Sequence, residues 1–127
     1  MPIISNGFDL VEVERVRKAL DRFGERFLKR CFTRGEIQFC STRRDPVPGF
    51  AVRYAAKEAT SKALGAGIAR GVGWKDIEIS RKRGEAPCII LHGRAAERFK
   101  HLDGAGIHVS LTHEKKLAGA IVLIESG

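Results

Sequence analysis

The most restrictive feature of this 127-residue sequence is a predicted helix, residues 50–64, with one face of small side chains. At 100° per residue, five alanines and one valine share an arc of roughly 140° around the helix axis. These residues are Ala51, Val52, Ala55, Ala56, Ala59 and Ala63. Residues 45–49 predict a turn before the helix, and Gly65 and Gly67 predict its end. Because small side chains permit close approach, we expect another element to pack directly against this face.

Helical periodicity is also present on the N-terminal side of this segment. Val16, Leu20, Phe23 and Phe27 recur at spacings of four, three and four, which predicts one buried stripe. Gly24 lies within this pattern and is expected to divide it into two short helices. The pair Thr33 and Glu36 has the spacing of a capping box, so a further helix is expected to begin there. A last short helix is marked by Ala95, Phe99 and Leu102.

The predicted strands are grouped rather than alternating regularly with helices. They are residues 3–13, 77–79, 88–91, 107–112 and 117–124, the last two forming a hairpin. Such grouping favours an α+β fold over a doubly wound sheet. We therefore expect a compact single domain, residues 1–127, with a mainly antiparallel sheet packed on the long small-faced helix.

Composition excludes several classes of protein. With 43% apolar and 30% charged residues, the chain has the mixture of a globular domain and is not disordered throughout. No apolar run approaches the roughly 20 residues that span a bilayer, and the opening lacks the features of a signal peptide. The three cysteines, Cys31, Cys40 and Cys88, lack paired spacing, which argues against a disulfide framework and a zinc site. We expect a cytoplasmic protein.

The net charge of +8 is concentrated in residues 15–34. Eight basic and two acidic residues lie in this window, which alone carries +6. Arg15, Arg22 and Arg26 project from the side opposite the apolar stripe. Such a patch suits a polyanion, whether nucleic acid, an acidic protein or a phosphorylated cofactor. The phenylalanines are assigned to the apolar stripe, which disfavours recognition of single strands by base stacking.

Three charged residues are candidates for chemistry. Glu58 and Lys62 lie four residues apart, so the simplest interpretation is a surface ion pair worth about 0.2–0.5 kcal/mol. Asp9 lies between apolar neighbours on the first predicted strand, where a carboxylate must be paired or bind a cation; alternatively, it caps the following helix. Two separate carboxylates with nearby lysines would suit Mg²⁺ bound to a polyphosphate.

Other features are less specific. His113 follows a predicted strand, where loops present functional groups, although a lone histidine in a turn is more often incidental. The glycines of residues 65–73 follow a helix rather than a strand, so they are not a dinucleotide-binding fingerprint. No P-loop motif occurs in the sequence.

Four segments resemble, in the family's order, the small 4′-phosphopantetheinyl transferases of the holo-acyl-carrier-protein synthase type. They are GFDLVEVER (7–15), FTRGE (32–36), FAVRYAAKEATSKALGAG (50–67) and VSLTHEKKLAGAIV (109–122). The third is the most specific because it joins FAxRYAA to KEAxxKALG, and the resemblance covers nearly the whole chain. The opening departs from the family's Gly-Ile-Gly-x-Asp but keeps Gly7 and Asp9.

The resemblance implies the fold of that family and transfer of 4′-phosphopantetheine from coenzyme A to a serine of apo acyl carrier protein. This reaction serves fatty acid biosynthesis and releases adenosine 3′,5′-bisphosphate. Asp9 and Glu58 would hold Mg²⁺ against the pyrophosphate, with Lys62 as the third catalytic residue. The residues assigned to coenzyme A are Arg53, Lys57, Ser61, Lys62, Gly65 and His113. The serine proton would pass to Glu58, to a Mg²⁺-bound water, which we favour, or to a water near His113.

The resemblance also implies partners. Arg15, Arg22 and Arg26 would receive the acidic carrier protein, and a homotrimer would place its active sites at clefts between subunits. No nucleic acid and no membrane take part in this interpretation. Two alternatives stay open: a basic, non-enzymatic nucleic-acid-binding domain, and a transferase whose carrier serves secondary metabolism. The first alternative predicts salt-dependent binding without any need for Mg²⁺ or coenzyme A.

Overall fold

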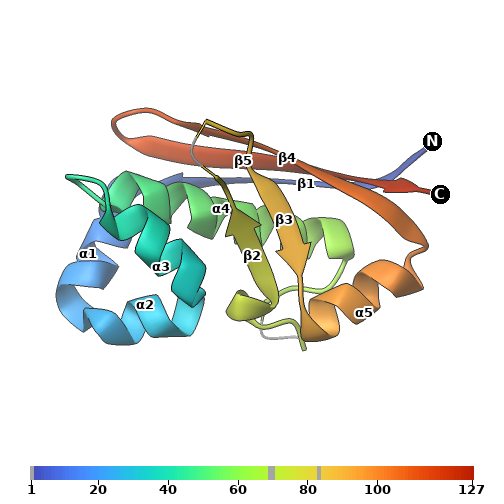
Figure 1. Ribbon diagram of the computed structural model, residues 1–127, viewed down its shortest axis with the longest axis horizontal. Coiled ribbons are helices and arrows are strands. Elements are labelled where there is room, and N and C mark those ends of the chain that lie inside the picture. Colours follow the sequence, from blue (N-terminus) through green and yellow to red (C-terminus); the bar gives the residue numbers. More distant parts are fainter. Residues whose placement is uncertain (1, 69–70, 83) are drawn as a thin grey trace.

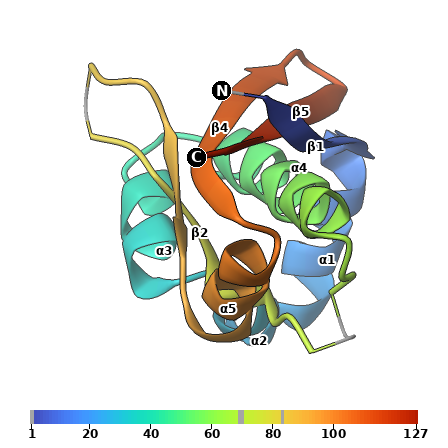
Figure 2. The same ribbon diagram turned by 90° about the vertical axis from the view of Figure 1, so that its right-hand side faces the viewer.

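A three-stranded antiparallel sheet lies over one long helix in the computed structural model, which describes residues 2–68, 71–82 and 84–127 (Figure 1). The strands, in the order β1-β5-β4, are β1 (Ile3–Glu12), β5 (Leu117–Ser126) and β4 (Gly104–His113). Helix α4 (Val47–Leu64) packs against β1 and β5 and is seen nearly end-on beneath the sheet in Figure 2. The predicted α+β class is confirmed.

The remaining elements lie on the other side of α4 from the sheet or at its ends (Figure 1). They are α1 (Val13–Phe23), α2 (Glu25–Cys31), α3 (Arg34–Ser41), the 3₁₀ turn η1 (Trp74–Asp76), the antiparallel pair β2 (Ile77–Ser80) and β3 (Cys88–Leu91), and α5 (Gly93–His101). Gly24, with φ +56°, divides α1 from α2 as predicted. The capping box is also confirmed, because the Thr33 hydroxyl accepts from Glu36 N and Thr33 N donates to Glu36 Oε1.

The start of the long helix differs from the sequence prediction. Helix α4 begins at Val47 inside the predicted turn, because a proline in the first turn of a helix lacks only an amide that would be unpaired there. Ala69 and Arg70, in the predicted glycine-rich connection, lie outside the described residues. No helix among the described residues is both long and apolar enough to cross a membrane.

The small face of α4 is where β1 meets the helix. Its six alanines and valines are all buried, at 4% exposure or less. On the strand, a Cβ added to Gly7 would overlap the carbonyl oxygen of Ala59 and lie 2.9 Å from Ala63 N. The two backbones therefore touch at Gly7. This close approach fixes the height at which the next inward residue of β1, Asp9, faces α4.

Replacing Gly7 by alanine is expected to destabilise the fold by about 1–3 kcal/mol, because the added methyl group must displace helix backbone. Urea unfolding measures the difference. Gly67→Ala is the matched control, since a Cβ at Gly67 meets no heavy atom within 4 Å. We expect its effect to stay within about 0.5 kcal/mol. Equal losses in the two variants would contradict the close approach.

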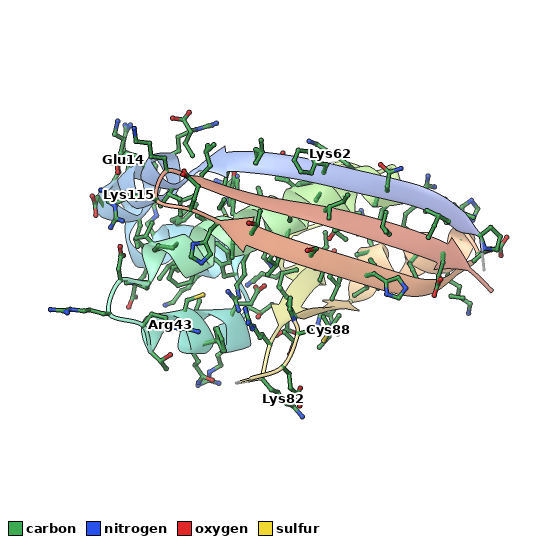
Figure 3. The ribbon with its side chains drawn as sticks, turned by 90° about the horizontal axis from the view of Figure 1, so that it is seen from above. Glu14, Arg43, Lys62, Lys82, Cys88 and Lys115 are labelled. Carbon is green, nitrogen blue, oxygen red and sulfur yellow. The ribbon has the colours of Figure 1, made fainter. Side chains whose placement is uncertain are left out.

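The outer face of the sheet is exposed in the isolated chain, and Figure 3 looks directly onto it (Figure 3). Phe8 and Leu10, expected to flank Asp9 on a buried strand, are each 54% exposed on this face. The expectation was wrong because β1 alternates: Asp9 faces α4 while its neighbours point away. Ile121 lies opposite Phe8 in the register and Leu117 opposite Glu12, and both are exposed as well.

Candidate active site

Asp9, Glu58 and Lys62 meet where β1 crosses α4. Lys62 Nζ lies 3.0 Å from Asp9 Oδ1 and donates a second hydrogen bond, of 2.9 Å, to the carbonyl oxygen of Phe8. The Asp9 side chain is 19% exposed and that of Lys62 is 54% exposed. In Figure 3, Lys62 lies beside the edge of the sheet formed by β1. The cluster is therefore open to solvent on one side and walled by strand and helix on the other.

Burial raises the pKa of the Glu58 carboxyl above its usual value. The nearby negative charge of Asp9 raises this pKa further, while Lys62 opposes the shift. Two carboxylates thus lie near enough to repel each other, on different elements, and among the described residues only Asp9 is in contact with a cation. A site of this kind attracts further positive charge.

Two sequence interpretations of these residues were wrong. Among the described residues Lys62 pairs with Asp9, and no ion pair joins Glu58 to Lys62. Spacing on one helix cannot reveal a competing carboxylate on a neighbouring strand, which is why the i,i+4 pair was expected. Asp9 is not a cap either, because it lies inside β1, three residues before its end.

Lys57 was expected to contact phosphates, but it lies in the core of the protein. Its side chain is fully buried, with Nζ 2.8 Å from Glu36 Oε1 and hydrogen-bonded to the carbonyl oxygens of Trp74 and Ile77. Glu36 is equally buried and also accepts from Ile79 N at 2.8 Å. Burial lowers the pKa of Lys57, and Glu36 opposes that shift. All donors of this ammonium are used inside the fold, where they join α4 to α3 and β2.

Ser61 and Gly65 complete the α4 set. Ser61 is 2% exposed and its hydroxyl donates to the carbonyl oxygen of Glu58 at 2.7 Å. Gly65 ends the helix in the left-handed region, with φ +72°. Its amide bonds back to Lys62 O, so both residues shape the end of α4 that carries Glu58 and Lys62.

Arg53 and His113 line a separate cavity of about 580 Å³. Arg53 is 3% exposed and its Nη1 donates to Gly49 O at 3.2 Å, while its Nε and Nη2 have no hydrogen-bond partner among the described residues. Its guanidinium lies 4.7 Å from the centroid of the Phe39 ring. Buried donors without partners favour an anionic ligand, because leaving them unpaired is costly.

Two further arginines of this cavity were missed by sequence reasoning. Arg43 and Arg81 line it together with Arg53 and His113. Arg43 follows α3 and Arg81 follows β2. No local sequence pattern connects these two segments. The only available signal was that both lie in basic, turn-rich stretches, and such stretches are ordinary surface features.

The two groups of site residues lie at opposite edges of the sheet. Asp9 is on the edge strand β1 and His113 on the other edge strand, β4, with β5 between them. In the register, His113 lies opposite Ala118, which in turn pairs with Val11. Two strand spacings separate the edges by roughly 10 Å. One subunit therefore does not bring His113 against Asp9.

The basic patch is arranged as predicted, with one correction. Arg15, Arg22 and Arg26 are exposed and form no ion pair within the described residues. Phe23, assigned to the buried stripe, is instead 49% exposed, with the Arg22 guanidinium 5.2 Å from its ring centroid. Phe23 is the last residue of α1, whose buried residues, Val13 and Val16, lie at its other end. The argument against base stacking therefore does not hold at this residue.

The patch borders an apolar cavity of about 470 Å³. Phe23, Phe27, Tyr54 and Trp74 line it together with Arg26. Tyr54 and Trp74 lie with ring centroids 4.6 Å apart, and Tyr54 precedes Glu58 by one helical turn. The cavity thus lies between the basic helices and the turn of α4 that precedes Glu58.

The described residues contain no cluster of three or more histidine, cysteine, aspartate or glutamate side chains arranged for a metal. Asp9 and Glu58 nevertheless fit Mg²⁺, which takes one or two protein carboxylates and fills its other positions with water and phosphate oxygens. Both provide hard oxygen atoms, and the site is open on the side where further ligands would enter.

Comparison with known proteins assigns this architecture to a family. Residues 5–120 match the family model of the 4′-phosphopantetheinyl transferase superfamily. The chain is 42% identical over 123 residues to the holo-[acyl-carrier-protein] synthase of Koribacter versatilis, covering 97% of this chain and 98% of that protein. The chain therefore belongs to the 4′-phosphopantetheinyl transferase superfamily, and the resemblance inferred from its sequence is confirmed.

Solved structures agree with this assignment. The holo-[acyl-carrier-protein] synthase of Neisseria meningitidis gives a TM-score of 0.89 at 27% identity, covering 98% of this chain and all of that one. The Helicobacter pylori enzyme, in complex with coenzyme A, gives 0.82 at 32% identity, covering 94% and 99%. The predicted fold of the family is thus confirmed, and one of these relatives binds coenzyme A.

Proposed function

We propose that this protein transfers 4′-phosphopantetheine from coenzyme A to a serine of apo acyl carrier protein, as a Mg²⁺-dependent holo-[acyl-carrier-protein] synthase of fatty acid biosynthesis. The observation that carries the proposal is the carboxylate pair Asp9 and Glu58 with Lys62, held at a strand–helix contact in a chain of this family. The coenzyme A complex of the Helicobacter pylori relative supports the donor.

The reaction breaks the phosphoanhydride bond of coenzyme A and forms a phosphodiester with serine. The serine oxygen forms a bond to the β-phosphorus of coenzyme A, the bond to the departing adenosine 3′,5′-bisphosphate breaks, and the serine proton passes to a base. Asp9 and Glu58 would hold the Mg²⁺, which when bound polarises the phosphoryl oxygens and offsets negative charge. Lys62 adds a positive charge beside the phosphates, and its exposed stem lets it reach them.

The arginine-lined cavity suits the other end of the donor. Arg53 has two buried guanidinium nitrogens without partners in the described part of the chain, and Arg43, Arg81 and His113 line the same cavity. Adenosine 3′,5′-bisphosphate carries phosphate groups that such donors bind as charge-assisted pairs. We place the nucleotide end of coenzyme A here.

A homotrimer reconciles the two sites. Within one subunit Asp9 and His113 lie on opposite edge strands of the sheet, and a second copy would bring its own His113 to the carboxylates. The exposed outer face of the sheet supplies an interface, since Phe8, Leu10, Leu117 and Ile121 are 40–54% exposed there.

The free thiols of the three cysteines suit the cytoplasm, where disulfides are rare.

Mass spectrometry tests the function directly. An apo acyl carrier protein of fatty acid synthesis is incubated with the protein, coenzyme A and Mg²⁺, beside an apo carrier of secondary metabolism. We expect the first to gain the mass of phosphopantetheine on its serine. No gain on either carrier would contradict the proposal, and faster modification of the second would reassign the pathway.

The basic patch leads to a separate prediction about the carrier. Arg15→Glu and Arg22→Glu are expected to raise the KM for the carrier at least several-fold, with the KM for coenzyme A nearly unchanged, because exposed charges act on encounter with an acidic partner. Moderate salt should reproduce the effect in the wild type. Lys100→Glu, on α5, is the control for net charge. A shift in the coenzyme A constant would instead assign the patch to the donor.

A further inference from the structure

Lys62 makes an unusual contact for a residue that is expected to bind phosphates. Its ammonium is directed back onto β1, 3.0 Å from Asp9 Oδ1 and 2.9 Å from Phe8 O. The lysine thus crosses from α4 to the strand and occupies the side of Asp9 that faces the open part of the site. Its side chain is 54% exposed, so this position is not enforced by surrounding packing.

The charges around this contact are unequal. Asp9 and Glu58 bring two negative charges, and Lys62 is the one cation in contact with either carboxylate among the described residues. One ammonium balances one of these two negative charges. A divalent cation bound to both carboxylates would balance both charges and would leave Lys62 with a like charge beside it.

We propose that Lys62 is an exchangeable counter-ion: it holds Asp9 until Mg²⁺ binds, is displaced from the carboxylate by the metal, and is thereby freed to bind the phosphates. This inference rests on the proposed Mg²⁺ site of Asp9 and Glu58. Mg²⁺ binds its oxygen ligands at about 2.0–2.1 Å with strict octahedral geometry, so an ammonium beside the same carboxylate crowds and repels it. A flexible lysine stem makes the exchange possible without movement of the backbone.

The exchange predicts the direction in which the Mg²⁺ affinity changes when the charge of Lys62 is removed. Because Lys62 competes with the metal, removing its charge must strengthen metal binding even though a phosphate-binding residue is lost. A lysine that only assists phosphate binding leaves Mg²⁺ affinity unchanged in the absence of coenzyme A. A lysine that stays on Asp9 as a fixed support for the site lowers metal affinity when it is removed.

Calorimetric titration with Mg²⁺ alone, without coenzyme A or carrier, separates these cases. We expect Lys62→Met to bind Mg²⁺ about tenfold more tightly than the wild type, the scale of one nearby unit charge in a partly exposed site. Lys62→Arg, which keeps the charge, is expected to bind like the wild type. Lys29→Met is the matched control, because Lys29 forms an exposed ion pair with Glu25 on α2.

Thermal unfolding gives a second readout that does not depend on activity. Without Mg²⁺, Lys62→Met should melt below the wild type, because Asp9 and Glu58 repel each other uncompensated. The same high Mg²⁺ concentration should raise its melting temperature more than that of the wild type, since stabilisation by a ligand grows with the logarithm of its concentration divided by its Kd. Equal or weaker Mg²⁺ binding by Lys62→Met would overturn the exchange, as would an equal gain in Lys29→Met.

Asp9→Asn distinguishes failure of the exchange from failure of the metal site. If Asp9→Asn loses Mg²⁺ binding but Lys62→Met gains none, the metal site stands and the exchange alone is wrong. If Asp9→Asn binds Mg²⁺ like the wild type, the metal is not held by Asp9, and both the assigned site and the exchange are overturned.

Discussion

Asp9→Asn and Glu58→Gln are each expected to lower kcat/KM for phosphopantetheine transfer by about 10²–10³-fold while leaving a folded protein. Each change replaces a carboxylate oxygen with a neutral amide oxygen of nearly the same shape, which is a weaker ligand for Mg²⁺. A bound metal provides several kcal/mol of charge stabilisation, and each 1.36 kcal/mol is tenfold in rate. Steady-state transfer to apo carrier protein, with circular dichroism as the folding check, measures the effect.

Glu12→Gln is the matched control for these variants. Glu12 lies on the same strand as Asp9 but is exposed, and its side chain makes no capping hydrogen bond to α1. Its loss should leave transfer within about twofold, since an exposed carboxylate away from such features contributes little. EDTA should reduce wild-type activity to the level of the site variants, and excess Mg²⁺ should restore it. Full activity in EDTA would refute the metal assignment.

Much of the fold could be predicted because its signals are local. The 3.6-residue period fixed the buried face of α4, Gly24 marked the division between α1 and α2, and Thr33 with Glu36 marked the start of α3. Strand and hairpin patterns located all five strands within a few residues. Each of these features depends on residues close together in the chain, so no knowledge of the tertiary structure was needed.

The site was predictable only in part because it depends on contacts between distant segments. Asp9 and Lys62 are 53 residues apart, and their ion pair requires the contact of Gly7 with Ala59. From the residues alone, Lys62 was paired with the wrong carboxylate. The resemblance to a family, rather than any spacing, connected Asp9 with Glu58. Arg43 was missed for the same reason, since only the folded chain brings it to Arg53.

Lys57 shows how adjacent residues of one motif can have unrelated roles. It directly precedes Glu58, and a charge on this helix suggests a ligand contact. A helical step of 100° is enough to turn one side chain into the core and leave the next in the site. The sequence contained one indication of this role in Glu36. A capping glutamate that becomes buried needs a positively charged partner, and Lys57 is that partner.

Lys57→Met is expected to destabilise the protein by about 3–5 kcal/mol, the largest loss of stability expected from any single change considered for this chain. Methionine keeps most of the volume, so the loss reports the charge. Without Lys57, the Glu36 carboxylate stays buried with only its amide donors, from Thr33 and Ile79, and the carbonyl oxygens of Trp74 and Ile77 lose their donor. Urea unfolding measures the free energy.

Two further variants identify the source of that loss. Lys29→Met removes an exposed lysine that lies 3.7 Å from Glu25, and should change stability by less than about 0.5 kcal/mol. Replacing both buried partners, as Lys57→Met with Glu36→Gln, should recover part of the loss, because no buried charge then lacks a counter-ion. Recovery stays incomplete, since the two carbonyl oxygens on η1 and β2 still lack a donor. A double variant no more stable than Lys57→Met would show that those backbone contacts, rather than the ion pair, hold α4 in place.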